Sequence, residues 1–187
     1  MNTRAITRIL MAAALLAGAA LGATKDSFPK PATDDEIAKQ VRHAILSYPY
    51  YYIWDQVGLF VHDGQVQLTG AVTEPYKKAD LARLVERVHG VAGVTNEIKV
   101  LPPSPMDQRL RHQVARAIFS YPPLTRYAAG PLPSIHIVVD SGHVTLSGVV
   151  STEGDKQLAG IRAMGAGLSF GEVVNNLEVE HPSSKKS

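Results

Sequence analysis

The sequence predicts an α+β protein made of two tandem αββαβ units, each a three-stranded mixed sheet with two helices packed on one face. Two observations predict this fold class. Segment 63–72 recurs as segment 141–150, with its glycines, apolar positions and small hydroxylated residue in the same order. Before each copy stand an apolar stripe at helical spacing and a Ser-Tyr-Pro tripeptide, 73 residues apart in both cases (37 to 110 and 47 to 120).

The N-terminus has the pattern of an export signal. Arg4 and Arg8 precede an apolar run that is too short to span a bilayer, and small residues follow it up to Ala23. We therefore expect a cleaved signal peptide at 1–23, a flexible lead-in at 24–32 and a mature protein outside the cytoplasm. The sequence has no cysteine, which excludes disulfides, thiol catalysis and a lipoprotein-type anchor on cysteine.

The first helix is predicted to begin at Thr33, where a capping box with Glu36 is possible, and to end before Pro49. An aromatic run follows at 48–54. Such side chains suit a boundary between protein, lipid headgroup and water. Alternatively, alternate members of the run pack under the first helix and close the core. The candidate binding residues of this run are Tyr50, Tyr51, Tyr52 and Trp54.

A β-hairpin is predicted around Asp63-Gly64, since both central residues of such a turn need positive φ. Counting back from the turn pairs Val61 with Val66 and places their side chains on one face. The opposite face is polar, so the sheet is expected to be covered on one side only. The second copy has the same pattern around Ser141-Gly142.

A second helix is predicted to begin near Pro75, and the strand 94–100 is expected to run parallel to the hairpin's second strand. The cations of this helix could touch acidic headgroups, although a charged outer face is typical of any surface helix. These further candidates are Lys77, Lys78, Arg83 and Arg87.

The second copy follows a proline-rich linker at 102–104 and is longer by five residues, which fall within 122–133. Glycines at 160, 165 and 167 interrupt its later helix, which we expect to be the more mobile one. The expected domains are 33–101 and 105–180, followed by a polar tail at 181–187.

Charge and motif content exclude several function classes. Without Arg4 and Arg8, 17 basic and 17 acidic residues remain, which disfavours a nucleic-acid partner. The seven histidines have no metal-ligand spacing and no phosphate loop is present, so we expect no catalytic residues, metal, cofactor or small-molecule substrate.

The duplicated unit has a Gly-x-Val-x-Leu-x-Gly-x-Val core, and in its first copy Gly90-Val91 precedes a strand that begins Val94-Thr95-Asn96. With these motifs it resembles the BON domain, a family named after bacterial osmotic-shock and nodulation proteins. The resemblance implies a non-enzymatic periplasmic protein that binds phospholipid or membrane surfaces, with a role in osmotic or envelope stress. The alternative is a protein–protein adaptor that holds another envelope protein through the open sheet face or an edge strand.

Overall fold

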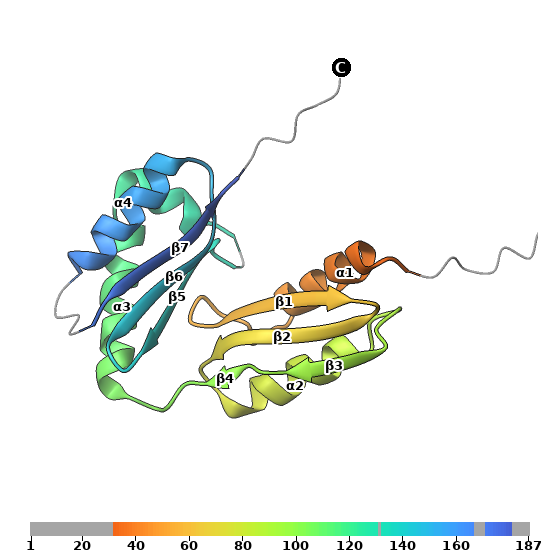
Figure 1. Cartoon of the computed structure of the whole chain (residues 1–187). Helices are drawn as coiled ribbons and strands as arrows, with labels where there is room; N and C mark the ends of the chain where they lie inside the picture. The colour runs from red at the N-terminus through yellow and green to blue at the C-terminus, as the bar shows by residue number, and fades with distance from the viewer. Residues whose placement is uncertain (1–31, 131, 167–170, 181–187) are drawn as a thin grey trace, which may run out of the picture. The chain divides into compact units, whose positions relative to one another are not determined.

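A computed structural model describes residues 32–130, 132–166 and 171–180, which fold into two αββαβ units (Figure 1). The predicted signal peptide, the lead-in up to residue 31 and the tail at 181–187 lie outside the described residues. None of the described helices has both the length and the apolar character needed to cross a membrane.

The first unit has the predicted order of elements. Strand β2 pairs antiparallel with β1, in the register Leu59 to Leu68 and Val61 to Val66, and parallel with β3 and β4. Its elements are α1 (Asp34–Leu46), β1 (Gln56–His62), β2 (Gln65–Val72), α2 (Pro75–Glu86), β3 (Gly93–Asn96) and β4 (Lys99–Val100).

The third strand of this unit differs from the prediction because it is divided in two. The side chain of Asn96 accepts a hydrogen bond from the amide of Ile98 and donates one to the carbonyl of Lys78 in α2. Ile98 is completely buried and lies between β3 and β4. Asn175 of the second unit makes the same pair of bonds, with Lys156 and Leu177, inside the unbroken strand β7 (Val173–Val179), so these bonds alone do not divide the strand.

The second unit repeats the topology with the sheet order β5-β6-β7, and β6 pairs parallel with β7. Part of the longer connection forms the 3-10 helix η1, and Gly165 ends α4 as its C-cap. Gly167 lies outside the described residues. The elements are α3 (Pro105–Phe119), η1 (Pro122–Ala128), β5 (Ile135–Asp140), β6 (His143–Val150), α4 (Glu153–Met164) and β7 (Val173–Val179).

Each hairpin turn is tied to the first helix of its unit by an aspartate. The carboxylate of Asp34 accepts hydrogen bonds from the amides of Asp63 and Gly64, both at 2.9 Å. Asp107 does the same for Ser141 and Gly142, at 3.0 and 2.9 Å. Both central residues of each turn have positive φ, as predicted. The tie fixes the start of each helix against the end of its hairpin.

The two units contact each other along the outer face and edge of β5. The amide of Ile137 donates to the carbonyl of Ile53 at 2.6 Å, and the Nδ1 atom of His136 lies 2.7 Å from the carbonyl oxygen of Asp55. His136 and Val138 are consequently 8% exposed, although they point away from their own core. The expectation of a sheet open on one side is therefore wrong for β5, because the segment after α1 covers it.

Candidate functional site

Three exposed tyrosines gather beside the start of α2. The rings of Tyr48 and Tyr50 meet edge to face at 5.7 Å, and those of Tyr50 and Tyr76 at 6.0 Å. Tyr50, Tyr52 and Tyr76 are 52%, 47% and 48% exposed, while Tyr48 is half-buried. We call these four residues the tyrosine patch. Tyr76 lies in α2, outside the aromatic run at 48–54, so the sequence analysis did not predict that it belongs to the patch.

The patch continues along one face of α2. Tyr76, Asp80, Arg83 and Arg87 stand at i, i+4, i+7 and i+11, which places them on the same side of a helix. Asp80 accepts hydrogen bonds from the Tyr48 hydroxyl at 2.6 Å and from Arg83 at 2.5 Å. These two bonds hold the pKa of the Asp80 carboxyl below its usual value, Tyr48 contributing more than Arg83. Counting in helical steps from Tyr76 is enough to predict that these four residues share one face of the helix.

Lys78 lies apart from that face. Its side chain is half-buried, and its carbonyl accepts the hydrogen bond from Asn96. Of the predicted cations, Arg83 and Arg87 are therefore the ones that share a helix face with the tyrosine patch.

Tyr51 and Trp54 do not join the patch. Tyr51 is 7% exposed, its hydroxyl accepts a hydrogen bond from the amide of Val57 at 3.2 Å, and burial raises its pKa to about 12. Trp54 packs against the core of the second unit, with its ring 5.2 Å from that of His112. The core interpretation of the aromatic run therefore applies to Tyr51, which lies in the core of the first unit, whereas Trp54 is half-buried against the second unit instead of under the first helix.

Lys77 is buried, so the expectation that it lies on the outer face of its helix is wrong. Its ammonium is 2.7 Å from the carboxylate of Asp55 and 2.8 Å from the hydroxyl of Thr73. Lys77 and Asp55 are 1% and 0% exposed. Asp55 also accepts hydrogen bonds from the amides of Tyr52 and Thr73. This ion pair anchors the loop before β1 to the start of α2.

The second unit has a network at the same place with the charges exchanged. Position 155 corresponds to position 77, and there Asp155 replaces the lysine. Its carboxylate accepts from Arg126 at 2.5 Å and from the hydroxyl of Tyr127 at 2.9 Å. That hydroxyl in turn accepts from the amide of Ser151, the equivalent of Thr73. In the first unit α2 supplies the cation of the pair, Lys77, and in the second unit α4 supplies the anion, Asp155.

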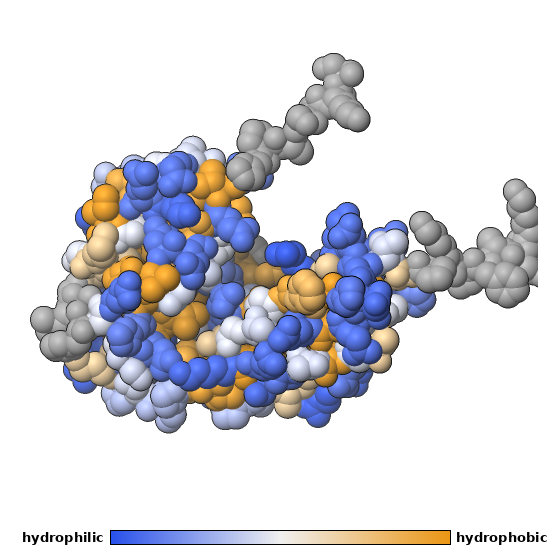
Figure 2. Space-filling view, in the orientation of Figure 1, coloured by the Kyte–Doolittle hydropathy of each residue, from blue (hydrophilic) through white to orange (hydrophobic). Residues whose placement is uncertain are grey.

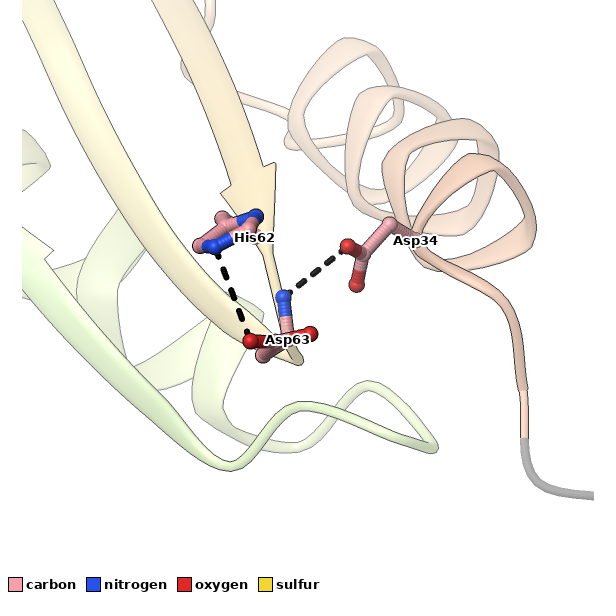
Figure 3. A group of neighbouring side chains, drawn as sticks. All are labelled: Asp34, His62 and Asp63. Atoms are coloured by element: carbon pink, nitrogen blue, oxygen red, sulfur yellow. Dashed lines mark hydrogen bonds and ion pairs between the residues drawn. The ribbon is translucent and has the colours of Figure 1, made fainter.

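One group among the described residues brings three potential metal-ligand atoms within 4.8 Å of one another, namely those of Asp34, His62 and Asp63 (Figure 3). Both carboxylate oxygens of Asp34 already accept turn amides, which lowers the pKa of this carboxyl. His62 and Asp63 are exposed. The tie between helix and turn explains why these groups lie together.

A groove of about 690 Å³ borders the tyrosine patch. Tyr52, Tyr76 and Trp54 line it, together with the prolines of the linker. On the face drawn in Figure 2, hydrophobic residues are interspersed with hydrophilic ones rather than collected in one broad apolar area. Such a surface suits shallow contact by a few aromatic side chains.

A family model described as "BON domain" matches residues 33–102 and 107–181. A search of curated proteins gives no match. Among solved structures, the chain is similar to the C-terminal domain of CdsD, a structural protein of the type III secretion system of Chlamydia trachomatis. That similarity has 15% identity and a TM-score of 0.31, over 80% of this chain and 67% of that one. A second CdsD structure has 12% identity and a TM-score of 0.28, over 79% and 94%.

Proposed function

Because this chain belongs to the BON domain family, we propose that it is an exported protein that binds phospholipid surfaces through its tyrosine patch. Proteins of this family are typically associated with the bacterial envelope, and their domains are in general not catalytic. The proposal includes a periplasmic location after removal of the signal peptide and a role in osmotic or envelope stress.

The observation that carries the proposal is the exposure of Tyr50, Tyr52 and Tyr76 in one place. A tyrosine ring has an apolar body and a polar tip, which suits the headgroup level of a bilayer. Arg83 and Arg87, on the same side of α2, can donate hydrogen bonds to lipid phosphates. Since Asp80 partly neutralises Arg83, we expect weak, reversible binding with modest salt dependence.

Vesicle co-sedimentation tests this proposal. Changing Tyr50 and Tyr76 together to alanine should reduce binding to phosphatidylcholine–phosphatidylglycerol vesicles about tenfold, because two exposed aromatic contacts are lost. Phe60→Ala is the matched control, since this aromatic residue is 64% exposed on β1. Equal binding by the double variant and the wild type would remove the tyrosine patch from the proposal.

The adaptor alternative rests on Phe60. Its large exposed ring stands on the outer face of the first sheet, opposite Gln67 on β2. Exposed aromatic residues are enriched at protein interfaces. If Phe60→Ala abolishes capture of an envelope protein while vesicle binding persists, the outer sheet face has a separate protein-binding role.

A further inference from the structure

A basic groove lies between α3 and the end of α4 in the second unit. It has a volume of about 530 Å³, within the range of small-ligand sites. Its polar lining comes mainly from one stripe of α3 at helical spacing, completed by one arginine of α4. The lining residues are Arg109, His112, Gln113, Arg116, Ala117, Ser120, Arg162, Gly165 and Ala166.

The lining of this groove contains three arginines and no carboxylate. Within the described part of the chain, no ion pair joins Arg109, Arg116 or Arg162 to an acidic side chain. The contrast with Arg126 is direct, since that arginine is paired with Asp155. Three like charges in one groove repel one another, and an anion between them relieves that repulsion.

Two of the arginines are held in place by their Nε atoms. Arg162 donates from Nε to the carbonyl of Ala117 at 3.0 Å, and its guanidinium lies 5.0 Å from the ring centre of Tyr121. Arg109 donates from Nε to the carbonyl of Pro105 at 3.3 Å. Neither bond uses the terminal nitrogens, which form the fork that binds two oxygens of one phosphate.

We propose that this groove binds a phosphate group, held by the terminal nitrogens of Arg109, Arg116 and Arg162. The tetrahedral oxygens accept hydrogen bonds from several guanidinium groups at once, and the phosphate charge balances the arginines. Either a soluble phosphate compound or the phosphate of a lipid headgroup provides this chemistry. The site is separate from the tyrosine patch and does not depend on the function proposed for it.

The first unit lacks the equivalent arginines, which supports a role specific to the second copy. At a displacement of 73 residues, Arg109 corresponds to Glu36 and Arg116 to His43. At a displacement of 78 residues, Arg162 corresponds to Leu84. Since none of the three arginines is retained, the shared fold alone does not require them.

Calorimetric titration of the mature chain with inorganic pyrophosphate tests the site. Changing Arg109 and Arg116 together to glutamine should weaken binding about tenfold or more, because hydrogen bonds to charged groups are lost. Lys39→Gln with Arg42→Gln removes the same charge from exposed positions of α1 and should change affinity less than about twofold. Arg162→Lys keeps the positive charge but loses the guanidinium group, which can bind two phosphate oxygens at once. This variant should therefore weaken pyrophosphate binding several-fold.

Two arms of the experiment separate the sources of phosphate. If the Arg109/Arg116 double variant loses binding to vesicles containing phosphatidic acid together with pyrophosphate binding, the groove binds a headgroup. If the Arg109/Arg116 double variant loses pyrophosphate binding but keeps vesicle binding, the groove takes a soluble ligand. Absence of pyrophosphate binding by the wild type, or equal weakening in both double variants, overturns the site. Binding of the Tyr50/Tyr76 variant to phosphatidylglycerol vesicles tests the other proposal independently.

Discussion

Lys77 and Asp55 form an ion pair in which neither side chain reaches solvent. Removing both charges from water carries a large desolvation cost, which their mutual attraction and the additional hydrogen bonds offset. Asp55 accepts from two backbone amides as well as from Lys77 and Thr73, so its four partners leave it well satisfied. Loss of either charged group would leave the other buried without its counterion.

Lys77→Met should therefore lower the free energy of unfolding by about 3–5 kcal/mol, because the Asp55 carboxylate remains buried without its cation. Urea denaturation followed by circular dichroism measures the change. Lys39→Met, at an exposed position of α1, is the control and should change stability by less than about 0.5 kcal/mol. A Lys77→Met protein as stable as the control would show that the pair contributes little.

The sequence analysis named Lys77 as a candidate residue but did not predict that it is buried. A lysine beside other cations on a helix resembles a solvent-facing residue, and Lys77 was assigned to the outer face for that reason. Its counterion, Asp55, comes from a loop 22 residues earlier, where no periodic pattern indicates burial. Non-local polar pairs of this kind become visible only when the fold brings the two segments together.

The hairpin turn and the first helix are joined in the same way in both units. Two amides of a tight turn would lack intramolecular partners unless a side chain accepted from them, and an aspartate in the first turn of α1 or α3 does so. Asp107 is only 2% exposed, so its bonds are shielded from water. The carboxylate is also favourably placed near the positive end of its helix.

Asp107→Asn should destabilise the protein by about 1–3 kcal/mol, since an amide group presents one oxygen and leaves one turn N–H facing another donor. Thermal or urea unfolding measures this change. Asp35→Asn, in the exposed first turn of α1, is the control. A matching loss of stability in both variants would assign the effect to helix charge rather than to the turn.

Acid should weaken the equivalent tie in the first unit. The turn amides lower the pKa of the Asp34 carboxyl in the folded state below its ordinary value of 3.8. The contribution of Asp34 to stability is therefore present above that ordinary value and is lost as the pH falls through the lowered folded value.

Local patterns were sufficient to predict most of the elements. The two-residue turn and the alternation of apolar residues fixed the hairpin register, and the crossover rule gave the parallel third strand. The division of that strand after Asn96 was not predicted, because the same asparagine pattern occurs in the divided strand of the first unit and in the unbroken strand β7 of the second, where Asn175 makes the equivalent bond. Tyr76 was missed as a patch residue because it is far in sequence from the aromatic run.

The association of the two units depends on the segment after α1. Ile53 pairs with β5 through its backbone, Trp54 inserts its ring against the second core, and the ring of Tyr51 lies 5.3 Å from that of His136. Lys99 of the first unit also pairs with Asp140 of the second. The carbonyl of Asp55 can only accept a hydrogen bond, so Nδ1 of His136 carries the proton. These contacts cover an edge strand that would otherwise be open to pairing.

Lowering the pH should loosen this association. Burial lowers the pKa of His136 from its ordinary value of 6.5, although the carbonyls of Asp55 and Tyr52 oppose the shift. The stabilisation is therefore complete above pH 6.5 and is lost as the pH falls below that value, where a separated His136 takes up a proton. Emission of Trp54, the one tryptophan of the chain, should shift to the red over this range.

Two variants identify the histidine responsible. His136→Gln should abolish the pH-dependent shift, because the ring of His136 makes the hydrogen bond to the carbonyl of Asp55 that joins the two units. His112→Gln should retain the shift, because the ring of His112 contacts the ring of Trp54 and takes no part in that hydrogen bond. If His112→Gln alone removes the shift, the fluorescence reports local quenching by His112 and the association of the units does not respond to pH.

The exchanged charges at positions 77 and 155 have a consequence for the evolution of the gene. Tandem copies are prone to recombination that replaces part of one repeat with its neighbour. A chain with α2 in the second unit would set Lys77 against Arg126, and one with α4 in the first unit would set Asp155 against the buried Asp55. The first product places two cations together at a partly exposed site, since the side chain of Arg126 is 54% exposed, and the second places two carboxylates together at a buried one. We therefore expect a chain with either exchange to be less stable than the wild type, so the two helices are not interchangeable between the repeats.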